Sequence, residues 1–253
     1  MTAISAEDLV VRRGTATLLE HLSLSFGATG SVALIGPNGA GKTTLLKVLA
    51  GLEKPTSGRV WLGSLDLVAM SKSMRARAIG FLPQYFEPHW DLTVAQLVDL
   101  GAQRAGALPV GALEKTTEAF ELVGLWGRRW STLSGGERSR VLLAMVLVAD
   151  PPILLADEPA AALDIRHRLD VIRALAERGR ERLSVVVVHD LDLAFRFFER
   201  VVVVVDGKIA IDGATAEVIG DRRLDAAFGV RFERLKTEQG WVLSASSESR
   251  AAG

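Results

Sequence analysis

A glycine-rich segment near the N-terminus has the residue types and spacing of a loop that binds nucleotide phosphates, G-x-x-x-x-G-K-[ST]. Glycines let the backbone curl so that successive N–H groups face phosphate oxygens, and the positive end of a following helix adds to that field. Lys42 would reach the β- and γ-phosphates, and the Thr43 hydroxyl would ligate Mg²⁺. A turn that holds a chance lysine is the alternative, which the position between a strand and a helix disfavours. The candidate residues are Gly36, Pro37, Asn38, Gly39, Ala40, Gly41, Lys42, Thr43 and Thr44.

Two adjacent carboxylates follow a short apolar run at residues 153–156. In an open α/β sheet, ligands bind at the carboxyl ends of the strands. Asp157 would hold Mg²⁺ directly or through water, and Glu158 would polarise an attacking water. An acidic pair after a strand is more often a helix cap or a solvated turn. The functional interpretation therefore depends on the presence of the phosphate loop.

The elements that must position these residues are short strands and helices. Alternating apolar and polar residues predict antiparallel strands at 9–12 and 21–26. Runs such as 185–188 are apolar on both faces, as in a covered parallel sheet. The tail after Val242 is small and polar and is expected to fray. Further strands are predicted at 31–35, 59–62, 78–82, 153–156, 183–188, 201–205 and 208–211, and helices at 43–50, 94–100, 111–123, 137–149 and 165–178.

These elements indicate an α/β fold, with a mostly parallel sheet core, an antiparallel β part on the N-terminal side and an inserted helical region. The length of 253 residues and the 49% hydrophobic content allow one sizeable core. Lysine plus arginine and aspartate plus glutamate number 30 each, which disfavours a protein that coats nucleic acid. Cysteine is absent, which excludes disulfides and thiolate metal sites.

No segment has the pattern of a signal peptide or a membrane span. The longest unbroken apolar run covers residues 141–149, whereas a bilayer needs about 20 residues. Any membrane connection is therefore expected to come from a partner.

The segment Leu133–Ser134–Gly135–Gly136–Glu137 resembles the signature of the ABC ATPase family, which is commonly L-S-G-G-Q. Ser134 and Glu137 also have the spacing of a capping box at the start of a helix, and both interpretations can hold. In this family the capped helix start presents N–H groups and a hydroxyl to the γ-phosphate of ATP held by the other subunit. Glutamate in place of glutamine is a known variant in importer subunits.

Other family motifs occur in the expected order, and the resemblance covers about residues 5–228. Gln84 resembles the glutamine that contacts Mg²⁺ and the attacking water, and it could also be an exposed loop residue. Asp164 matches the family's D-loop, although it could equally be a helix N-cap. His189 matches the switch histidine that contacts the γ-phosphate, whereas a lone histidine at a strand end is usually structural.

One position departs from the family pattern. The family often has an aromatic residue about 25 positions before the phosphate loop, where it stacks on adenine. The corresponding segment Val10–Gly14 has no aromatic residue, and Arg12 or Arg13 could stack its guanidinium on the base instead. Either arginine could also be solvated, and Arg13 is taken as the candidate ATP contact.

A cluster of aromatic residues follows Gln84. It comprises Tyr85 and Phe86, then His89 and Trp90 after a proline. Exposed aromatic residues mark partner surfaces, and a buried cluster that packs helices is the equal alternative.

The resemblance implies a P-loop NTPase (RecA-like) fold and a single ABC ATPase domain over residues 1–253. The core would cover about 3–87 and 151–228, the helical subdomain about 88–150, and a C-terminal extension about 229–253. It further implies an ATPase with ATP and Mg²⁺ as cofactors, acting as an ATP-dependent homodimer. Each ATP would lie between one copy's phosphate loop and Ser134, Gly135, Gly136, Glu137 and Asp164 of the second copy.

The implied partners are integral-membrane permease subunits and a periplasmic or surface substrate-binding protein, but no nucleic acid. The implied location is the cytoplasmic side of the bacterial inner membrane. The resemblance extends most to ATPases that import iron chelates, haem or cobalamin. The alternatives are a non-transport ABC ATPase in DNA repair or on ribosomes, an export ATPase, and a nucleotide sensor without turnover.

Overall fold

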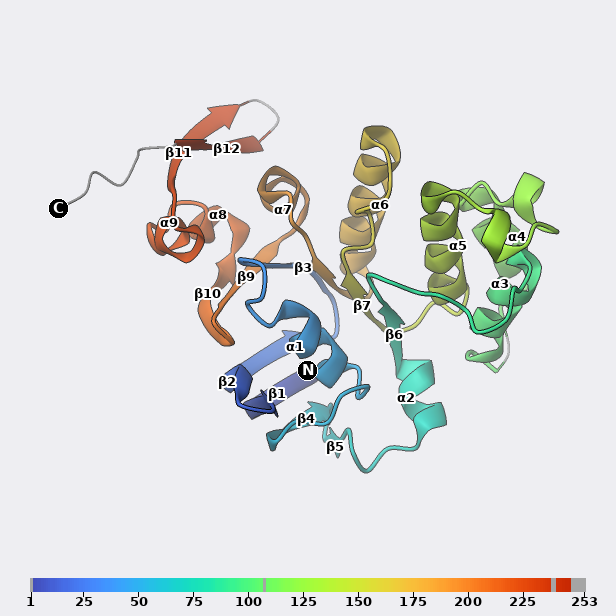
Figure 1. Ribbon diagram of the computed structural model, residues 1–253, viewed down its shortest axis with the longest axis horizontal. Coiled ribbons are helices and arrows are strands. Elements are labelled where there is room, and N and C mark those ends of the chain that lie inside the picture. Colours follow the sequence, from blue (N-terminus) through green and yellow to red (C-terminus); the bar gives the residue numbers. More distant parts are fainter. Residues whose placement is uncertain (1, 107, 238–239, 247–253) are drawn as a thin grey trace.

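The computed structural model describes residues 2–106, 108–237 and 240–246. Its central element is a six-stranded sheet in the order β10-β9-β3-β8-β7-β6 (Figure 1). The strands from β9 to β6 pair in parallel, and β10 pairs with β9 antiparallel through the turn at Asp206 and Gly207. The strands are β3 (Gly30–Ile35), β6 (Ile79–Leu82), β7 (Ile153–Asp157), β8 (Leu183–Val187), β9 (Arg200–Val205) and β10 (Lys208–Ala214).

An antiparallel sheet in the order β2-β1-β4-β5 lies beside this core at the N-terminal side. The strands predicted at 9–12 and 21–26 are parts of much longer strands. Asp8 and His21 have positive φ values of 49° and 48°, and the β1–β2 register shifts between Ala6 and Leu9. Such bulges interrupt the two-residue alternation, so the sequence pattern revealed only fragments. The strands are β1 (Thr2–Arg13), β2 (Ala16–Gly27), β4 (Ser57–Leu62) and β5 (Leu65–Asp66).

Helices cover the parallel sheet and form the insert on the β6 side in Figure 1. Helix α1 (Lys42–Leu49) follows the phosphate loop directly, and α6 (Ile165–Glu177) and α7 (Leu191–Phe197) follow β7 and β8. The insert contains α3 (Val94–Gln103), α4 (Ala112–Ala119) and α5 (Gly135–Leu147). The remaining helices are α2 (Lys72–Ala78), α8 (Thr215–Val218) and α9 (Arg223–Phe228), with short 3-10 helices at Val123–Leu125, Trp130–Thr132 and Arg178–Arg180.

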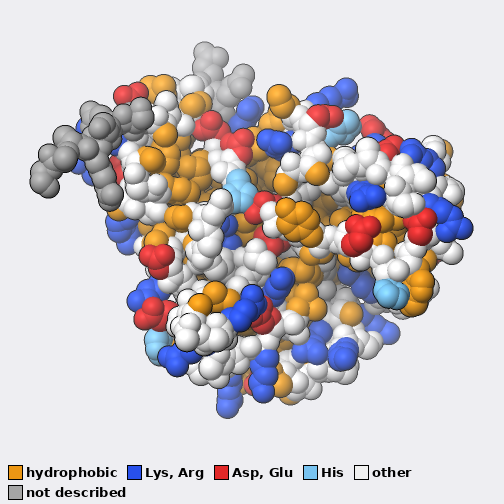
Figure 2. Space-filling view, viewed as in Figure 1, with side chains coloured by type: hydrophobic (Ala, Val, Ile, Leu, Met, Phe, Trp, Pro, Cys, Tyr) orange, Lys and Arg blue, Asp and Glu red, His pale blue; other side chains and the backbone are white. Residues whose placement is uncertain are grey.

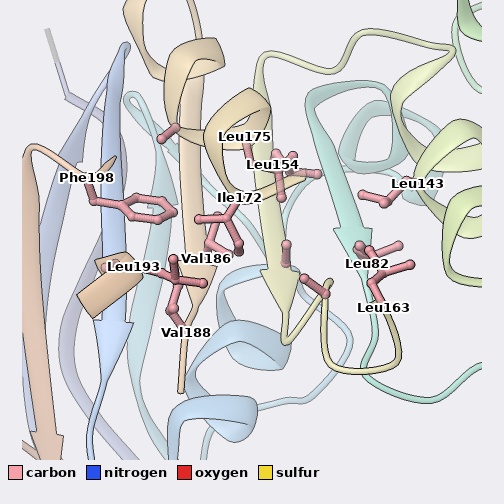
Figure 3. Close-up of a cluster of buried hydrophobic side chains, with 14 of the residues drawn as sticks. Leu82, Leu143, Leu154, Leu163, Ile172, Leu175, Val186, Val188, Leu193 and Phe198 are labelled. Atoms are coloured by element: carbon pink, nitrogen blue, oxygen red, sulfur yellow. The ribbon is translucent and has the colours of Figure 1, made fainter. Parts of the chain in front are cut away.

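Both faces of the parallel sheet are buried, as the apolar runs predict. On one face Leu154 and Val186 pack toward Ile172 of α6 and Leu193 of α7 (Figure 3). On the other face, alternate residues such as Val185 join a second cluster with β1, β2 and α1. The sheet therefore packs between two apolar layers. This packing holds the carboxyl ends of its strands in place.

The C-terminal segment is better ordered than its composition predicts. Residues after Val242 were expected to fray, but β12 (Gly240–Ser246) pairs along its length with β11 (Arg231–Thr237), so this expectation is wrong for residues 243–246. The Leu243 N–H donates to Asp192 Oδ1 in α7 at 2.9 Å, and Arg234 pairs with Asp225 at 2.6 Å. Long-range contacts with α7 and α9 order a strand that small polar residues would not stabilise locally. Residues 247–253 lie outside the described ranges.

Figure 2 shows acidic and basic side chains interspersed over the face that it presents. Within the described ranges, no helix combines the length and the apolar character that a membrane crossing requires.

Candidate functional site

The phosphate loop connects β3 to α1 and depends on glycine at two positions where another backbone approaches. Gly36 has φ 144°, and a Cβ there would lie 2.0 Å from the Val204 carbonyl oxygen. Gly41 has φ 101°, and a Cβ there would lie 2.6 Å from the Leu18 carbonyl oxygen. The Gly207 N–H donates to the Ala40 carbonyl at 3.0 Å. The loop is therefore held between β2 and the β9–β10 turn, and only glycine fits at both contacts.

Lys42 provides a buried positive charge at this loop. Its side chain folds back, and Nζ donates to the carbonyl oxygens of Gly36 and Pro37, each at 2.8 Å. Burial lowers the pKa of Lys42 from its ordinary value, and the nearby charges of Glu158 and Asp157 oppose that shift. The ammonium group is thus pre-positioned over the loop where an anion would be neutralised.

Asp157 ends β7 with a side chain that is almost fully buried, and its Oδ1 lacks a hydrogen-bond partner within the described residues. Burial raises the pKa of Asp157, and a hydrogen bond with the Thr43 side chain opposes the increase. A buried, unpartnered carboxylate oxygen beside a hydroxyl is the donor set that Mg²⁺ accepts, usually together with substrate phosphates. Thr43 and Asp157 therefore fit a magnesium ion.

Two polar side chains, which follow the strands on either side of β7, meet at Glu158. Gln84 Nε2, after β6, donates to Glu158 Oε2 at 2.8 Å. His189 Nε2, after β8, lies 2.5 Å from Glu158 Oε1. Glu158 itself has φ 52°, an uncommon conformation for a residue other than glycine, and such conformations cluster at active sites. The arrangement holds both carboxylate oxygens at the sheet edge that carries the phosphate loop.

Most of the candidate residues line one cavity of about 550 Å³, a size typical of small-molecule sites. The lining includes the loop residues 38–44 together with Gln84, Glu158 and His189. Arg13 also lines this cavity, so the structure places it beside the phosphate loop. Leu18 lines the cavity too, although no feature of the sequence distinguishes it from other aliphatic residues of β2.

The residues of the L-S-G-G-E segment do not line this cavity. Ser134 caps α5: its Oγ accepts from the Glu137 N–H at 3.3 Å, and Glu137 Oε2 accepts from the Ser134 N–H at 2.7 Å, so the predicted capping box is confirmed. These bonds lower the pKa of Glu137, as does the charge of Arg128. A Cβ on Gly135 or Gly136 would lie 3.8 Å from residues of the 161–164 segment, so the two segments adjoin.

Asp164 is the N-cap of α6, as one of its two interpretations predicts. Its Oδ1 accepts from the His167 N–H at 3.0 Å, and its Oδ2 lies 2.8 Å from His167 Nδ1. These hydrogen bonds lower the pKa of Asp164. Asp164 also lies outside the lining of the phosphate-loop cavity, so the chain carries two separate groups of candidate residues.

The aromatic cluster after Gln84 is partly exposed and partly packed against the helical insert. Tyr85 and Trp90 are 84% and 71% exposed. Phe86 packs edge-on against the buried Trp130, with ring centroids 5.6 Å apart. The segment therefore combines a packing contact with an exposed aromatic surface.

A mostly parallel sheet whose glycine-rich loop faces an acidic pair defines a P-loop nucleoside triphosphatase. Residues 19–161 match the family model described as ABC transporter, and the chain belongs to the ATP-binding proteins of that family. It is an ABC transporter ATPase, which binds ATP and hydrolyses it for transport.

The similar proteins include import ATP-binding proteins. The hemin import ATP-binding protein HmuV of Bradyrhizobium diazoefficiens is 39% identical over 228 residues, covering 85% of this chain and 84% of that protein. The cobalamin import ATP-binding protein BtuD of Halobacterium salinarum is 38% identical over 222 residues, covering 85% of this chain and 56% of that protein. A solved dimeric ATP-binding cassette in a post-hydrolysis state, bound to ADP and Pi, has a TM-score of 0.75 and 27% identity, covering 84% of this chain and 98% of that one.

Proposed function

We propose that this chain is one of two identical ATPase subunits that drive a separate membrane permease, with haem, cobalamin or an iron chelate as the imported cargo. The names of the similar hemin and cobalamin import proteins support this cargo class. A substrate-binding protein outside the membrane would deliver the cargo, and the ATPase pair would work at the cytoplasmic side. Uptake of labelled haem by cells with and without this chain tests the cargo.

The observation that carries the homodimer proposal is the separation of the two groups of candidate residues. The phosphate loop, Gln84, Glu158 and His189 line one cavity, and the 134–137 and 161–164 segments lie outside it. Both groups have the residue types of a nucleotide site, and a second copy arranged head to tail would bring them together. Each ATP would then lie between the phosphate loop of one copy and the capped start of α5 in the other. The division into a core at 3–87 and 151–228, a helical part at 88–150 and an extension at 229–253 belongs to this proposal.

In the proposed site the loop N–H groups and Lys42 bind the phosphates, and the loop glycines permit their close approach. Thr43 and Asp157 would hold Mg²⁺, with Gln84 as a further ligand, and the ion when bound neutralises charge on the phosphoryl oxygens. Arg13 contacts the nucleoside. From the second copy, Ser134, Gly135, Gly136 and Glu137 face the γ-phosphate, with Asp164 beside them.

Glu158 is the group proposed to orient the attacking water. In the isolated chain its two carboxylate oxygens are occupied by Gln84 and His189. A γ-phosphate at the end of the cavity offers new acceptors to both partners, which would release one oxygen of Glu158 for a water molecule. Hydrolysis then depends on positioning and on electrostatic stabilisation of the phosphoryl oxygens.

The variant Glu158→Gln tests this assignment. It keeps the size of the side chain but removes the charge that polarises water, so ATP hydrolysis should fall about 100-fold or more while ATP affinity stays within about threefold. Phosphate release and nucleotide titration measure the two quantities. Glu114→Gln, on the exposed surface of α4, is the matched control and should hydrolyse ATP at the wild-type rate. A Glu158→Gln protein with wild-type turnover would exclude the assigned role.

A further inference from the structure

The position of His189 depends on the short segment between β8 and α7. Strand β8 ends two residues before His189, and α7 begins two residues after it, with Asp190 as the N-cap. The Asp190 carboxylate accepts from the Leu193 N–H at 3.2 Å. The His189 side chain is 46% exposed, so its own packing does little to hold it. The first turn of α7 must therefore help to fix where the imidazole lies.

Helix α7 is too short to be stable without tertiary contacts. It has seven residues, whereas isolated helices below about 12–15 residues are marginal in water. One side of the helix is buried through Leu193, Ala194 and Phe195. Strand β12, from the C-terminal end of the chain, also contacts α7 (Figure 1). The conformation of α7 therefore depends on a segment far away in the sequence.

A hydrogen bond joins β12 to the first turn of α7. The Leu243 N–H donates to Asp192 Oδ1 at 2.9 Å, and Asp192 lies three positions after His189. The side chains of Leu243 and Trp241 pack against the same apolar cluster as Leu191 of α7. A carboxylate in the first turn also interacts favourably with the helix dipole. The contact with β12 thus stabilises the end of α7 that follows His189.

The hairpin of β11 and β12 is itself anchored to the core. Arg234 of β11 donates to the Ile219 carbonyl at 2.6 Å and pairs with Asp225 of α9 at 2.6 Å. The buried Phe232 meets Phe228 of α9 edge-on, with ring centroids 5.9 Å apart. A two-stranded hairpin is marginal on its own, and these contacts hold it in place. It therefore connects α9 to the first turn of α7.

We propose that the C-terminal hairpin positions His189 for ATP hydrolysis through the Asp192–Leu243 hydrogen bond, which makes Asp192 a positioning residue. This inference rests on the proposed contact between His189 and the γ-phosphate. A reaction that depends on the placement of such groups is sensitive to displacements of about 1 Å. A hairpin that only covered the apolar side of α7 would change stability without acting through His189, and the two roles can be separated by experiment.

Steady-state ATP hydrolysis by the full chain tests the proposal with Asp192→Ala, which removes the acceptor of the Leu243 N–H. The kcat should fall about three- to tenfold, as expected for one lost hydrogen bond, while the KM for ATP stays within about twofold. Asp192→Asn keeps an oxygen that can accept the same bond, so its kcat should lie within about twofold of the wild type. Glu217→Ala removes a carboxylate from the exposed first turn of α8 and should hydrolyse ATP at the wild-type rate.

A double-mutant cycle shows whether Asp192 acts through His189. In a His189→Ala background, adding Asp192→Ala should lower the hydrolysis rate less than about 1.5-fold, because the group that it positions is gone. Single-turnover phosphate release at high enzyme concentration measures these slow variants. Hydrogen exchange provides a readout that does not depend on activity: amides of residues 190–197 should exchange faster in Asp192→Ala than in the wild type.

Equal losses from Asp192→Ala in both backgrounds would indicate a general loss of stability and would overturn the proposal. So would a wild-type kcat for Asp192→Ala, unchanged exchange of the α7 amides, or an Asp192→Asn variant as impaired as Asp192→Ala. A His189→Ala protein with a wild-type kcat would instead contradict the proposed role of His189. The failure of the positioning role and the failure of the proposed function are therefore distinguishable.

Discussion

Asp157 shows how a residue that suits a ligand can lower the stability of the folded chain when no ligand is bound. Its carboxyl group is buried, and one oxygen lacks a partner within the described residues. Because burial raises its pKa above the ordinary value of 3.8, the folded chain holds this proton more tightly than the unfolded chain does. The stabilising contribution of Asp157 is therefore complete below that ordinary value and is lost as the pH rises through the raised one.

The variant Asp157→Asn should consequently be more stable than the wild type at neutral pH without nucleotide, by about 1 kcal/mol. This advantage should shrink as the pH falls toward 3.8. Urea unfolding across that pH range measures it, and MgATP should raise the midpoint of the wild type more than that of the variant. Asp170→Asn, at an exposed position on α6, should show neither effect. A constant difference at every pH would contradict the argument.

Residue types at fixed spacing were sufficient to predict which side chains would gather around the phosphate loop. The loop, Gln84, Glu158 and His189 share one cavity because each follows a strand of the same sheet. The choice of Arg13 over Arg12 had no support from the strand pattern, since successive residues of a strand point to opposite faces and the bulges of β1 hide the register. Leu18 was missed because an aliphatic residue carries no chemical signal.

At the scale of elements, the contact between α3 and α5 depends on a glycine inside a helix. A Cβ on Gly101 would lie 1.8 Å from the Met145 carbonyl oxygen, and Gly101 is buried. The two helices can therefore approach more closely than a larger side chain would allow. This contact helps to set the position of α5 and of its capped N-terminus.

Replacing Gly101 with alanine tests this contact. Alanine favours a helix over glycine by about 1 kcal/mol, but overpacking a backbone contact costs about 1–3 kcal/mol, and a separation of 1.8 Å requires α3 to move. We expect Gly101→Ala to lower the free energy of unfolding by about 1–2 kcal/mol in urea titrations. Gly124→Ala, whose Cβ would meet nothing within 4 Å, should change it little. Equal stabilities for the two variants would show that the helices adjust freely.

Elements with strong periodicity or apolar runs were predicted close to their observed bounds, as for α1, β7 and β9. Those that depend on distant contacts were not. The strands β11 and β12 are held by Arg234 and by the Asp192–Leu243 hydrogen bond, whose partners are 51 positions apart in the chain. Helix α2 escaped prediction because it is short and none of its residues is buried, so it has no apolar stripe.

At the scale of the whole molecule, the proposed homodimer predicts that ATP binding changes the oligomeric state of the chain. In the Glu158→Gln background, MgATP should convert monomers to dimers, as measured by light scattering. Adding Ser134→Arg places a bulky cation at the capped start of α5, so it should abolish the dimer while leaving the affinity of the monomer for ATP within about twofold. Ser64→Arg, at the exposed turn between β4 and β5, should dimerise normally. A Ser134→Arg protein that still dimerises would exclude the head-to-tail arrangement.

The hydrogen bond from Gly207 to Ala40 ties the phosphate loop to a turn more than 160 positions further along the chain. A loop braced in this way has its shape before any nucleotide arrives. The entropy of ordering it belongs to the folding of the chain and need not be supplied again at each turnover. Nucleotide can thus bind and leave repeatedly while the phosphate loop keeps its shape. Any conformational change during turnover is then expected outside this loop.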